Sequence, residues 1–124
     1  MEKTEKQLAL EFINLAAKGD SRKAFAEFVG EDFKHHNAFF KSDPNALMIA
    51  MEEEARKNPE HSLEVKQAWQ CGNMVTVLSH VKRNIADPGV AVVHIFRFED
   101  NKIQEFWDVA QAIPEQTINE NGMF

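Results

Sequence analysis

The stretch "VVHIFRFEDNKIQEFWDVAQ", residues 92–111, decides the fold of this chain. Two apolar, aromatic-rich runs flank a central Asp-Asn pair, which is the pattern of a β-hairpin. His94 and Asp108 interrupt these runs at positions where packing residues are expected. The two side chains therefore face either water or a cavity that uses them, and the length of the turn decides whether they share a face.

Two turn lengths fit the residues between the runs. Side chains alternate along a strand, so a one-residue slip reverses every face. A two-residue turn at Asp100-Asn101 pairs His94 with Trp107 and sends Asp108 to the other face. A three-residue loop over 99–101 instead pairs His94 with Phe106 and puts Asp108 diagonally beside it.

The composition of the resulting faces favours the three-residue loop. Asn101 would then adopt the left-handed region, which asparagine tolerates. This register gathers aromatic residues, one imidazole and one carboxylate on a single face, whereas the opposite face is mixed. We therefore predict that His94 and Asp108 lie together on an interior face that contains His94, Phe96, Phe98, Phe106, Asp108 and Ala110.

The first half of the chain is predicted to be helical. Thr4 and Gln7 fit a capping box, and apolar residues then recur at helical spacing. Gly19 and Gly30 suit helix ends, and Pro44 suits the first turn of a third helix. The pattern predicts helices over residues 4–19, 20–30 and 44–59, with an irregular connector, "EDFKHHNAFFKSD", over residues 31–43.

The second half changes to a strand-like period. The run "SLEVKQAWQC" alternates, "GN" is a hairpin signal, and "MVTVLSHVKR" is alternating and β-branched. Together with the hairpin of residues 92–111, this predicts four antiparallel strands after the helices. We expect one α+β domain over residues 1–124, in which the helices cover the concave side of a curved sheet and enclose a pocket.

Composition narrows the classes of function. The net charge is −6, whereas a nucleic-acid surface needs clustered Lys and Arg. No apolar run approaches the length of a membrane span, and residues 1–12 lack the apolar core of a secretory signal. Cys71 is the single cysteine, and no His-x-His or His-x₃-His spacing is present. We expect a cytoplasmic protein that uses no cofactor and no metal.

The His94–Asp108 pair suggests proton transfer. A carboxylate among phenylalanines loses hydration, which disfavours its charged form and makes it a ready proton donor or acceptor. An imidazole beside it can donate to a substrate oxygen or orient the acid. The alternative is a buried imidazolium–carboxylate pair in which each group satisfies the other, with no chemistry.

Other polar residues are weaker candidates for the same pocket. His80 either lines the pocket with Thr76 and Leu78 or faces the surface. His35, His36 and Asn37 fall in the connector beside aromatic residues, where they form either an exposed pair of histidines or a functional loop. Trp69 and Trp107 suit either the core or a pocket wall.

Several segments resemble the SnoaL-like polyketide cyclases of the nuclear-transport-factor-like superfamily, in the branch described as predicted SnoaL-like aldol-condensation enzymes. The matching pieces are "HHN" at 35–37, "LSHVKR", "VVHIFRFEDNKIQEFWDVAQAIP" at 92–114 and the closing "NENGMF". The resemblance implies a cone-shaped α+β barrel with a deep apolar pocket. It also implies an acid/base aspartate on the last strand, an assisting histidine on the preceding strand, and a homodimer formed through the sheet.

Asp108 and His94 match those two roles in strand placement. Steroid isomerases of the superfamily use a tyrosine oxyanion donor, but this chain contains no tyrosine. We therefore expect acid/base chemistry, aldol-type cyclisation or isomerisation, on a small apolar carbonyl compound. Asp108 would shuttle the proton and His94 and His80 would polarise the carbonyl, while the ligand-binding residues would be His36, Asn37, Trp69, Phe96 and Phe106. The alternative is a non-catalytic ligand-binding module or a dimeric interaction domain.

Overall fold

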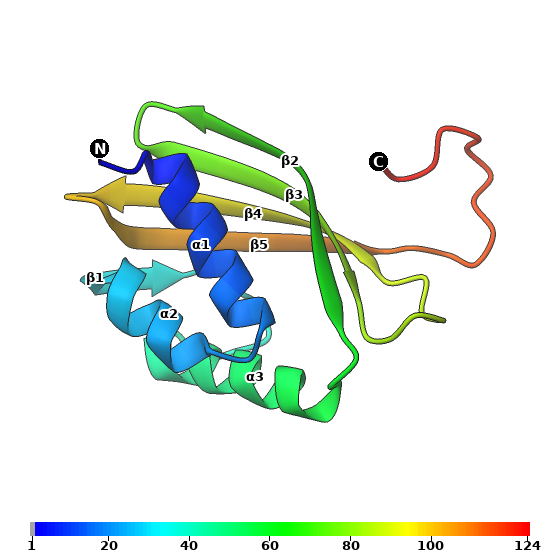
Figure 1. Cartoon of the computed structure of the whole chain (residues 1–124), viewed down its shortest axis with the longest axis horizontal. Coiled ribbons are helices and arrows are strands. Elements are labelled where there is room, and N and C mark those ends of the chain that lie inside the picture. Colours follow the sequence, from blue (N-terminus) through cyan, green and yellow to red (C-terminus); the bar gives the residue numbers. More distant parts are fainter. Residues whose placement is uncertain (1) are drawn as a thin grey trace.

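The computed structural model describes residues 2–124 and contains three helices and five strands (Figure 1). Along the chain these are α1 (Glu5–Ala17), α2 (Ser21–Phe28), β1 (Val29–His35), α3 (Pro44–Lys57), β2 (Ser62–Cys71), β3 (Met74–Lys82), β4 (Val90–Glu99) and β5 (Lys102–Ala112). The three predicted helices and four predicted strands are all present. No helix among residues 2–124 has the length and apolar character needed to cross a membrane.

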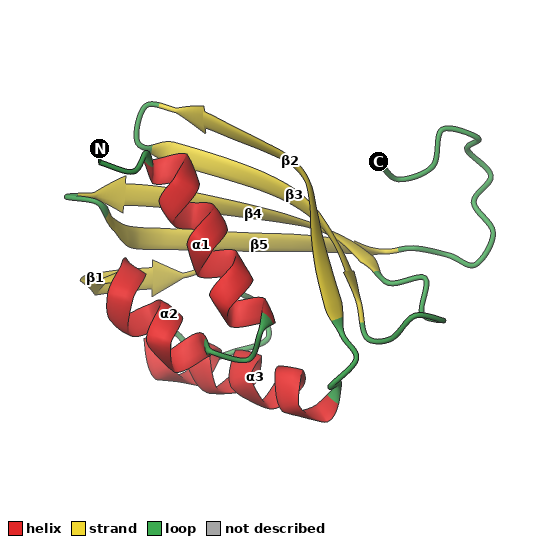
Figure 2. Cartoon of the chain, in the orientation of Figure 1, coloured by secondary structure: helices red, strands yellow, loops and turns green. Residues whose placement is uncertain are grey.

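All five strands form one sheet in the order β1-β5-β4-β3-β2. Strands β2 to β5 are antiparallel neighbours, whereas β1 runs parallel to β5. The helices cover one face of this sheet, and β2 bends strongly along its length (Figures 1 and 2). The α+β prediction is confirmed, but the sheet is mixed and not wholly antiparallel as predicted. We call the face toward the helices the inner face and the opposite one the outer face.

Strand β1 was not predicted, because its sequence lacks the period of a strand. Glu31 and Asp32 are both exposed, and Phe33 is the first buried side chain of the strand. Its register against β5 also shifts, from Val29 opposite Ile103 to Lys34 opposite Glu105. A short, irregular edge strand of this kind gives little alternation to detect. The predicted connector is therefore partly a strand, and α2 ends before Gly30.

The β4–β5 hairpin has a different turn from the one predicted. Glu99 pairs with Lys102 across a two-residue turn, in which Asp100 and Asn101 have φ values of 51° and 60°. Positive φ at both central residues is the geometry of a type I′ turn, which follows the natural twist of a hairpin. The preferred three-residue loop was therefore wrong.

A β-bulge next to this turn brings His94 and Asp108 onto the same face of the hairpin. Phe98 pairs with Ile103, but Arg97 pairs with Glu105, so Gln104 is an extra residue in β5. From this point the register is one residue further along, and His94 lies directly opposite Asp108. The predicted shared face is therefore right, although neither of the two registers considered for it is the real one.

The core is an aromatic cluster between α1 and the inner face of the sheet. Phe12 on α1 contacts Phe25, Phe96 and Phe106 with ring centroids 5.5–6.2 Å apart. The N-terminus of α1 is held by the predicted capping box, since the Thr4 hydroxyl accepts from the Gln7 backbone N–H and the Gln7 side chain accepts from the Thr4 N–H. Helix α1 is thus fixed over the strands that carry His94 and Asp108.

Asn101 tests the assignment of the turn. We expect Asn101→Ala to lower the free energy of unfolding by about 1 kcal/mol, because alanine is strained at positive φ. Asn101→Gly should be neutral or stabilising, since glycine adopts this conformation without strain. Both variants lose the same amide, so the difference between them reports the backbone alone. Urea unfolding followed by circular dichroism measures it, and equal stabilities would contradict the type I′ turn.

Candidate functional site

His94 and Asp108 face each other across β4 and β5 on the inner face of the sheet. The His94 ring lies against two core phenylalanines, with its centroid 5.5 Å from Phe106 and 6.2 Å from Phe96. Beyond this pair, toward the start of β4 and the end of β5, Ala110 is exposed. The pair therefore lies at the edge of the aromatic core, with buried Val92 and exposed Ala110 paired beyond it.

Both residues are half-buried, yet each has one covered polar atom without a partner. His94 Nδ1 and Asp108 Oδ1 are buried and make no hydrogen bond. The two side chains do not hydrogen-bond to each other, although their backbones are paired. The self-satisfied imidazolium–carboxylate pair considered from the sequence is therefore not what the structure contains.

Burial lowers the pKa of His94 to about 4, and the nearby Asp108 carboxylate opposes this only in part. His94 is consequently a neutral imidazole at pH 7. A neutral ring offers one N–H donor and one acceptor nitrogen, so it can donate a hydrogen bond to a substrate oxygen without carrying a charge.

Asn37 holds the other oxygen of the carboxylate. Its Nδ2 donates to Asp108 Oδ2 at 2.9 Å, and its Oδ1 accepts from the backbone N–H of Phe39 at 3.0 Å. The side chain of Asn37 is thus fixed at both ends. This leaves Oδ1 of Asp108 as the unpaired carboxylate oxygen.

His35 orders the loop that carries Asn37. It is buried, and its Nδ1 accepts from the Asn37 backbone N–H at 3.2 Å while its Nε2 meets the Lys41 carbonyl at 2.7 Å. Since an accepting Nδ1 carries no proton, Nε2 is the donor to Lys41. The role of His35 is structural, and its burial follows from the missed strand β1.

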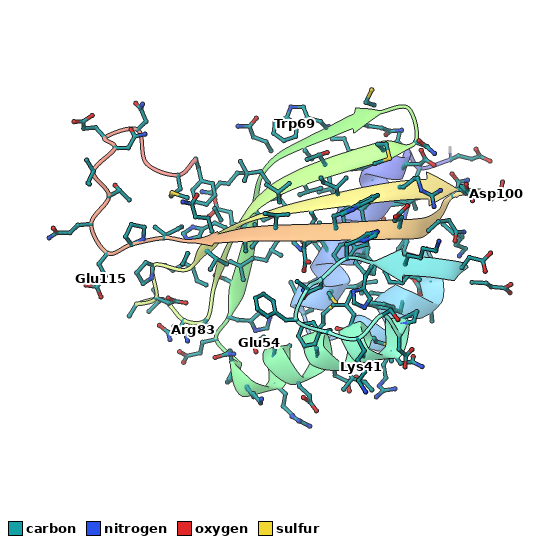
Figure 3. The ribbon with its side chains drawn as sticks, turned by 180° about the vertical axis from the view of Figure 1, so that it is seen from behind. Lys41, Glu54, Trp69, Arg83, Asp100 and Glu115 are labelled. Atoms are coloured by element: carbon teal, nitrogen blue, oxygen red, sulfur yellow. The ribbon has the colours of Figure 1, made fainter. Side chains whose placement is uncertain are left out.

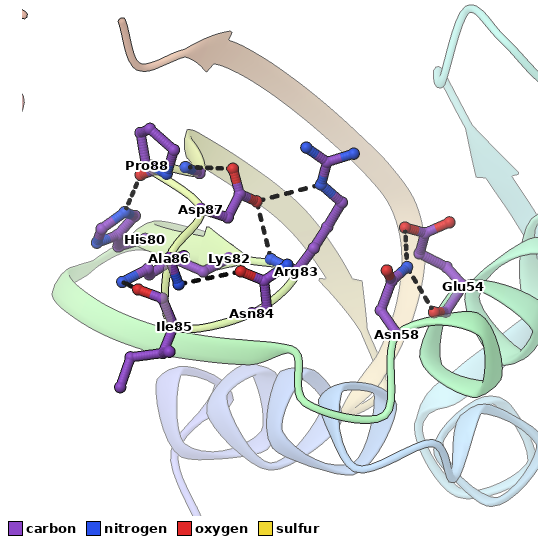
Figure 4. A network of polar contacts seen from close by, with 11 residues as sticks. Glu54, Asn58, His80, Lys82, Arg83, Asn84, Ile85, Ala86, Asp87 and Pro88 are labelled. Carbon is purple, nitrogen blue, oxygen red and sulfur yellow. Dashed lines mark hydrogen bonds and ion pairs between the residues drawn. The ribbon is translucent and has the colours of Figure 1, made fainter. Parts of the chain in front are cut away.

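His80 is not part of this site. It pairs with Ala91, while Val77 pairs with His94, so alternation puts His80 on the outer face. Its Nε2 contacts the Pro88 carbonyl at 2.8 Å. Pro88 is in the loop after β3, in which the Arg83 backbone N–H also donates to the Asp87 carboxylate (Figure 4). Hydrogen bonds from the Arg83 backbone and side chain lower the pKa of Asp87 to about 2. The expectation that His80 lines the same pocket was wrong.

His36 and Trp69 also lie on the outer side. The His36 ring stacks on Trp107 at 5.0 Å, and its Nε2 contacts Glu105 Oε2 at 2.6 Å. The hydrogen bond from His36 and a second one from Arg97 lower the pKa of Glu105. Trp69 is half-exposed on β2, on the side away from the helices (Figure 3). Neither residue is on the inner face with Asp108, so the prediction that both bind a ligand in the same pocket was wrong.

Phe96 and Phe106 are core residues with exposures of 0% and 2%. Their rings pack against the His94 ring, and they do not line an open pocket. Of the predicted site residues, the structure therefore brings together Asp108, His94 and Asn37. Among residues 2–124 no three His, Cys, Asp or Glu side chains are grouped closely enough to hold a metal ion.

Two surface hollows stand out on the described part of the chain, and neither is next to Asp108. One of about 340 Å³ is lined by Lys18, Gly19, Glu52, Ala55, Arg56, Pro59 and His61. The other, of about 300 Å³, is lined by Glu2, Lys3, Leu8, Glu27, Phe28, Asn101 and Lys102. An apolar pocket beside Asp108 therefore stays a prediction.

The fold and the place of the His94–Asp108 pair can now be compared with known proteins. A family model described as a SnoaL-like domain matches residues 9–106. The chain belongs to the SnoaL-like family. The match contains Asn37 and His94 and ends two residues before Asp108. No curated protein sequence matches the chain.

Solved structures confirm the nuclear-transport-factor-like fold. An NTF2-like protein of unknown function from Cytophaga hutchinsonii has a TM-score of 0.71 at 18% identity, covering 90% of this chain and 93% of its own. A candidate polyketide cyclase from Bacillus cereus has a TM-score of 0.71 at 20% identity, covering 83% and 71%. A candidate isomerase of the SnoaL-like family from Agrobacterium tumefaciens has a TM-score of 0.70 at 9% identity, covering 89% and 100%.

The low pKa of His94 can be measured directly. Its imidazole resonances should titrate in NMR with a midpoint near pH 4 and not near the ordinary 6.5, because burial disfavours the charged ring. A midpoint at or above 6.5 would show that the ring is hydrated.

The lowered pKa of His94 also makes the free energy of unfolding depend on pH. The folded pKa lies below the unfolded value, so the unfolded chain binds a proton first as the pH falls. Between pH 6.5 and about 4, His94 should therefore remove roughly 3 kcal/mol from the free energy of unfolding. The measurement compares the wild type with His94→Leu, so that the titration of the other groups is common to both proteins. The variant should lose less stability on acidification, whereas parallel pH profiles would contradict the burial of the ring.

Proposed function

We propose that this SnoaL-like protein performs acid/base chemistry on a small, largely apolar carbonyl compound, with Asp108 as the base and His94 as the donor to the carbonyl oxygen. The observation that supports this is the half-buried carboxylate with one oxygen held by Asn37 and the other unpaired, directly opposite a neutral imidazole. Unpaired buried polar atoms are costly, and they are tolerated mainly where function requires them.

The reaction begins with removal of a proton beside the carbonyl. Asp108 Oδ1 takes this proton, the electrons of the C–H bond form the new carbon–carbon double bond, and the carbonyl electrons move to oxygen. The resulting enolate oxygen receives a hydrogen bond from the neutral His94 ring. Asp108 then returns its proton by one of two routes. In a substrate with a carbon–carbon double bond next to the deprotonated carbon, the proton goes to the far carbon of the dienolate, which gives isomerisation. Where the enolate carbon attacks a second carbonyl, the proton goes to the resulting alkoxide, which gives aldol-type cyclisation.

Asn37 keeps the carboxylate in one orientation during these steps. The amide donates to Oδ2, so Oδ1 is the oxygen left to exchange the proton. A carboxylate that is fixed in this way loses little entropy when it meets the substrate. Asn37 was predicted as a ligand-binding residue, and the proposal makes it a positioning residue for Asp108.

Asp108→Asn tests the proposal. The probe is butyl methyl ketone in deuterium oxide, and proton NMR follows the exchange of the protons next to its carbonyl. We expect the wild type to accelerate this exchange and Asp108→Asn to lose the acceleration by about 10²-fold or more, because an amide cannot accept the proton.

Glu105→Gln is the matched control, since it removes a carboxylate from the outer face of the same strand and should keep the exchange rate. Equal exchange by the wild type and Asp108→Asn would contradict the proposal. A non-catalytic binding module predicts no acceleration by either form, with the ketone still bound by both.

We also propose that the protein is a homodimer formed through the outer face of its sheet, as the resemblance to the family implies. The face exposes Trp69 by 50% and Val109 by 66%. Two cross-strand rows join them to further side chains, of which all but Thr76 and Gln67 are apolar. The rows are Trp69, Thr76, Ile95 and Trp107, then Gln67, Leu78, Val93 and Val109. Monomeric proteins rarely expose a contiguous apolar surface of this kind, and a twofold contact would cover it on both copies.

Val109→Lys should separate the dimer, because it places a charge in the centre of an apolar contact. Light scattering coupled to size-exclusion chromatography measures the mass. Ile85→Lys is the control, since Ile85 is 90% exposed in the loop after β3 and should leave the mass unchanged. A wild type that is monomeric at micromolar concentration would overturn the proposal without affecting the acid/base site.

A further inference from the structure

The closing motif "NENGMF", residues 119–124, has no role in the proposed reaction, yet it has a defined structure. The side-chain oxygen of Asn119 accepts from the Asn121 backbone N–H at 2.9 Å, and the Asn119 carbonyl accepts from the Gly122 N–H at 3.2 Å. Gly122 has a φ of 71°, a conformation that glycine adopts without strain. The motif therefore builds a tight turn, after which the chain comes back toward the sheet.

The turn brings Phe124 to the outer face of the sheet. Its ring centroid lies 5.0 Å from that of His80 on β3, and the Lys66 ammonium of β2 lies 5.3 Å from the centre of the Phe124 ring. We call residues 113–124 the arm. The arm leaves the end of β5, extends beyond the sheet and returns to it at Phe124 (Figure 1).

The contacts within the chain do little to hold the arm in this course. Of its residues only Ile113 and Met123 are half-buried, and the others are exposed. Ile118 is 100% exposed, so its side chain touches nothing else in residues 2–124. Fixing the backbone costs conformational entropy at every residue, and a ring contact with one cation–π contact returns little of this cost. A second molecule that packs against the arm would supply the missing contacts.

The position of the arm indicates that this molecule is a second copy of the chain. His80 is on the outer face, two residues along β3 from Leu78, which belongs to one of the two rows of the proposed dimer contact. Phe124 therefore anchors the arm directly beside that contact. A partner that covers the rows also lies next to the arm, and twofold symmetry lets each copy donate one arm and receive one.

We propose that the arm packs against the second copy of this chain in the dimer and that Ile118 is the side chain that the partner covers. This inference rests on the proposed dimer and adds to it a contact outside the sheet. Covering Ile118 removes its apolar surface from water on both copies, so one position in the sequence contributes twice to the stability of the dimer.

Ile118→Ser tests the proposal through the dissociation constant of the dimer, measured by sedimentation equilibrium. We expect the constant to rise about tenfold or more, because each dimer loses the burial of two isoleucine side chains. Ile85→Ser is the matched control, since it makes the same change at another isoleucine, which is 90% exposed in the loop after β3, and it should leave the constant unchanged. Equal constants for Ile118→Ser and the wild type would overturn the proposal.

Phe124→Ala should also raise the dissociation constant, because it removes the anchor that holds the arm beside the dimer contact. The double variant Ile118→Ser/Phe124→Ala should be no weaker a dimer than the more affected single variant, since both changes act through the same arm. A double variant whose loss equals the product of the two single losses would contradict the role of Phe124 as the anchor of Ile118.

A mixed dimer of carbon-13-labelled and unlabelled copies shows directly which molecule the arm touches. Filtered NMR spectra of this sample record nuclear Overhauser effects between the copies and exclude those within one copy. The Ile118 methyl groups should show such effects to protons of the partner. A dimer without them would contradict the packing of the arm against the second copy.

Val109→Lys separates this inference from the proposed sheet contact. If Val109→Lys separates the dimer but Ile118→Ser does not weaken it, the arm proposal fails and the sheet contact remains. If Ile118→Ser weakens the dimer but Val109→Lys does not, the sheet contact fails and the arm remains. A monomeric wild type overturns both, and none of these outcomes affects the test of proton exchange by Asp108.

Discussion

The extra residue at Gln104 is the constraint on which the candidate site depends. The type I′ turn alone would place His94 and Asp108 on opposite faces of the β4–β5 hairpin. The bulge shifts the register by one residue and brings them directly opposite each other on the inner face. The interruption in the β1–β5 register lies at the same place, between Ile103 and Glu105.

Glycine at position 30 belongs to the same arrangement. A Cβ atom there would lie 2.1 Å from the Nε2 atom of Gln104, so a side chain at position 30 would displace the end of the glutamine side chain where β1 passes the bulge. Strand β1 then continues to His35 and Asn37, and Asn37 reaches the carboxylate of Asp108. The bulge therefore acts on both sides of β5: it aims the carboxylate toward His94 on one side, and it accommodates the strand that leads to the asparagine on the other.

The sequence predicted the parts of the fold that follow a regular period. The capping box of α1, the three helices and the four hairpin-connected strands were all visible, because local propensity and alternation agree there with the tertiary structure. Strand β1 was not visible, because its pairing joins it to residues of β5 that are about 70 positions away in the chain. The bulge was not visible, because an extra residue within a strand leaves no mark in a simple alternating pattern. The site followed the same division: Asp108 and His94 were found on one face, whereas His80, His36 and Trp69 were misplaced.

The hydrogen bond between Asn37 and Asp108 joins residues separated by 71 positions in the chain. Both the parallel β1–β5 pairing and this bond must wait until the last strand has been synthesised and has docked between β4 and β1. Long-range parallel pairing is among the slower steps of folding, since a large loop must close before any contact rewards it. A nascent chain on the ribosome can thus assemble its helices and the β2–β3 hairpin early, while Asn37 and Asp108 remain apart until β5 has been synthesised.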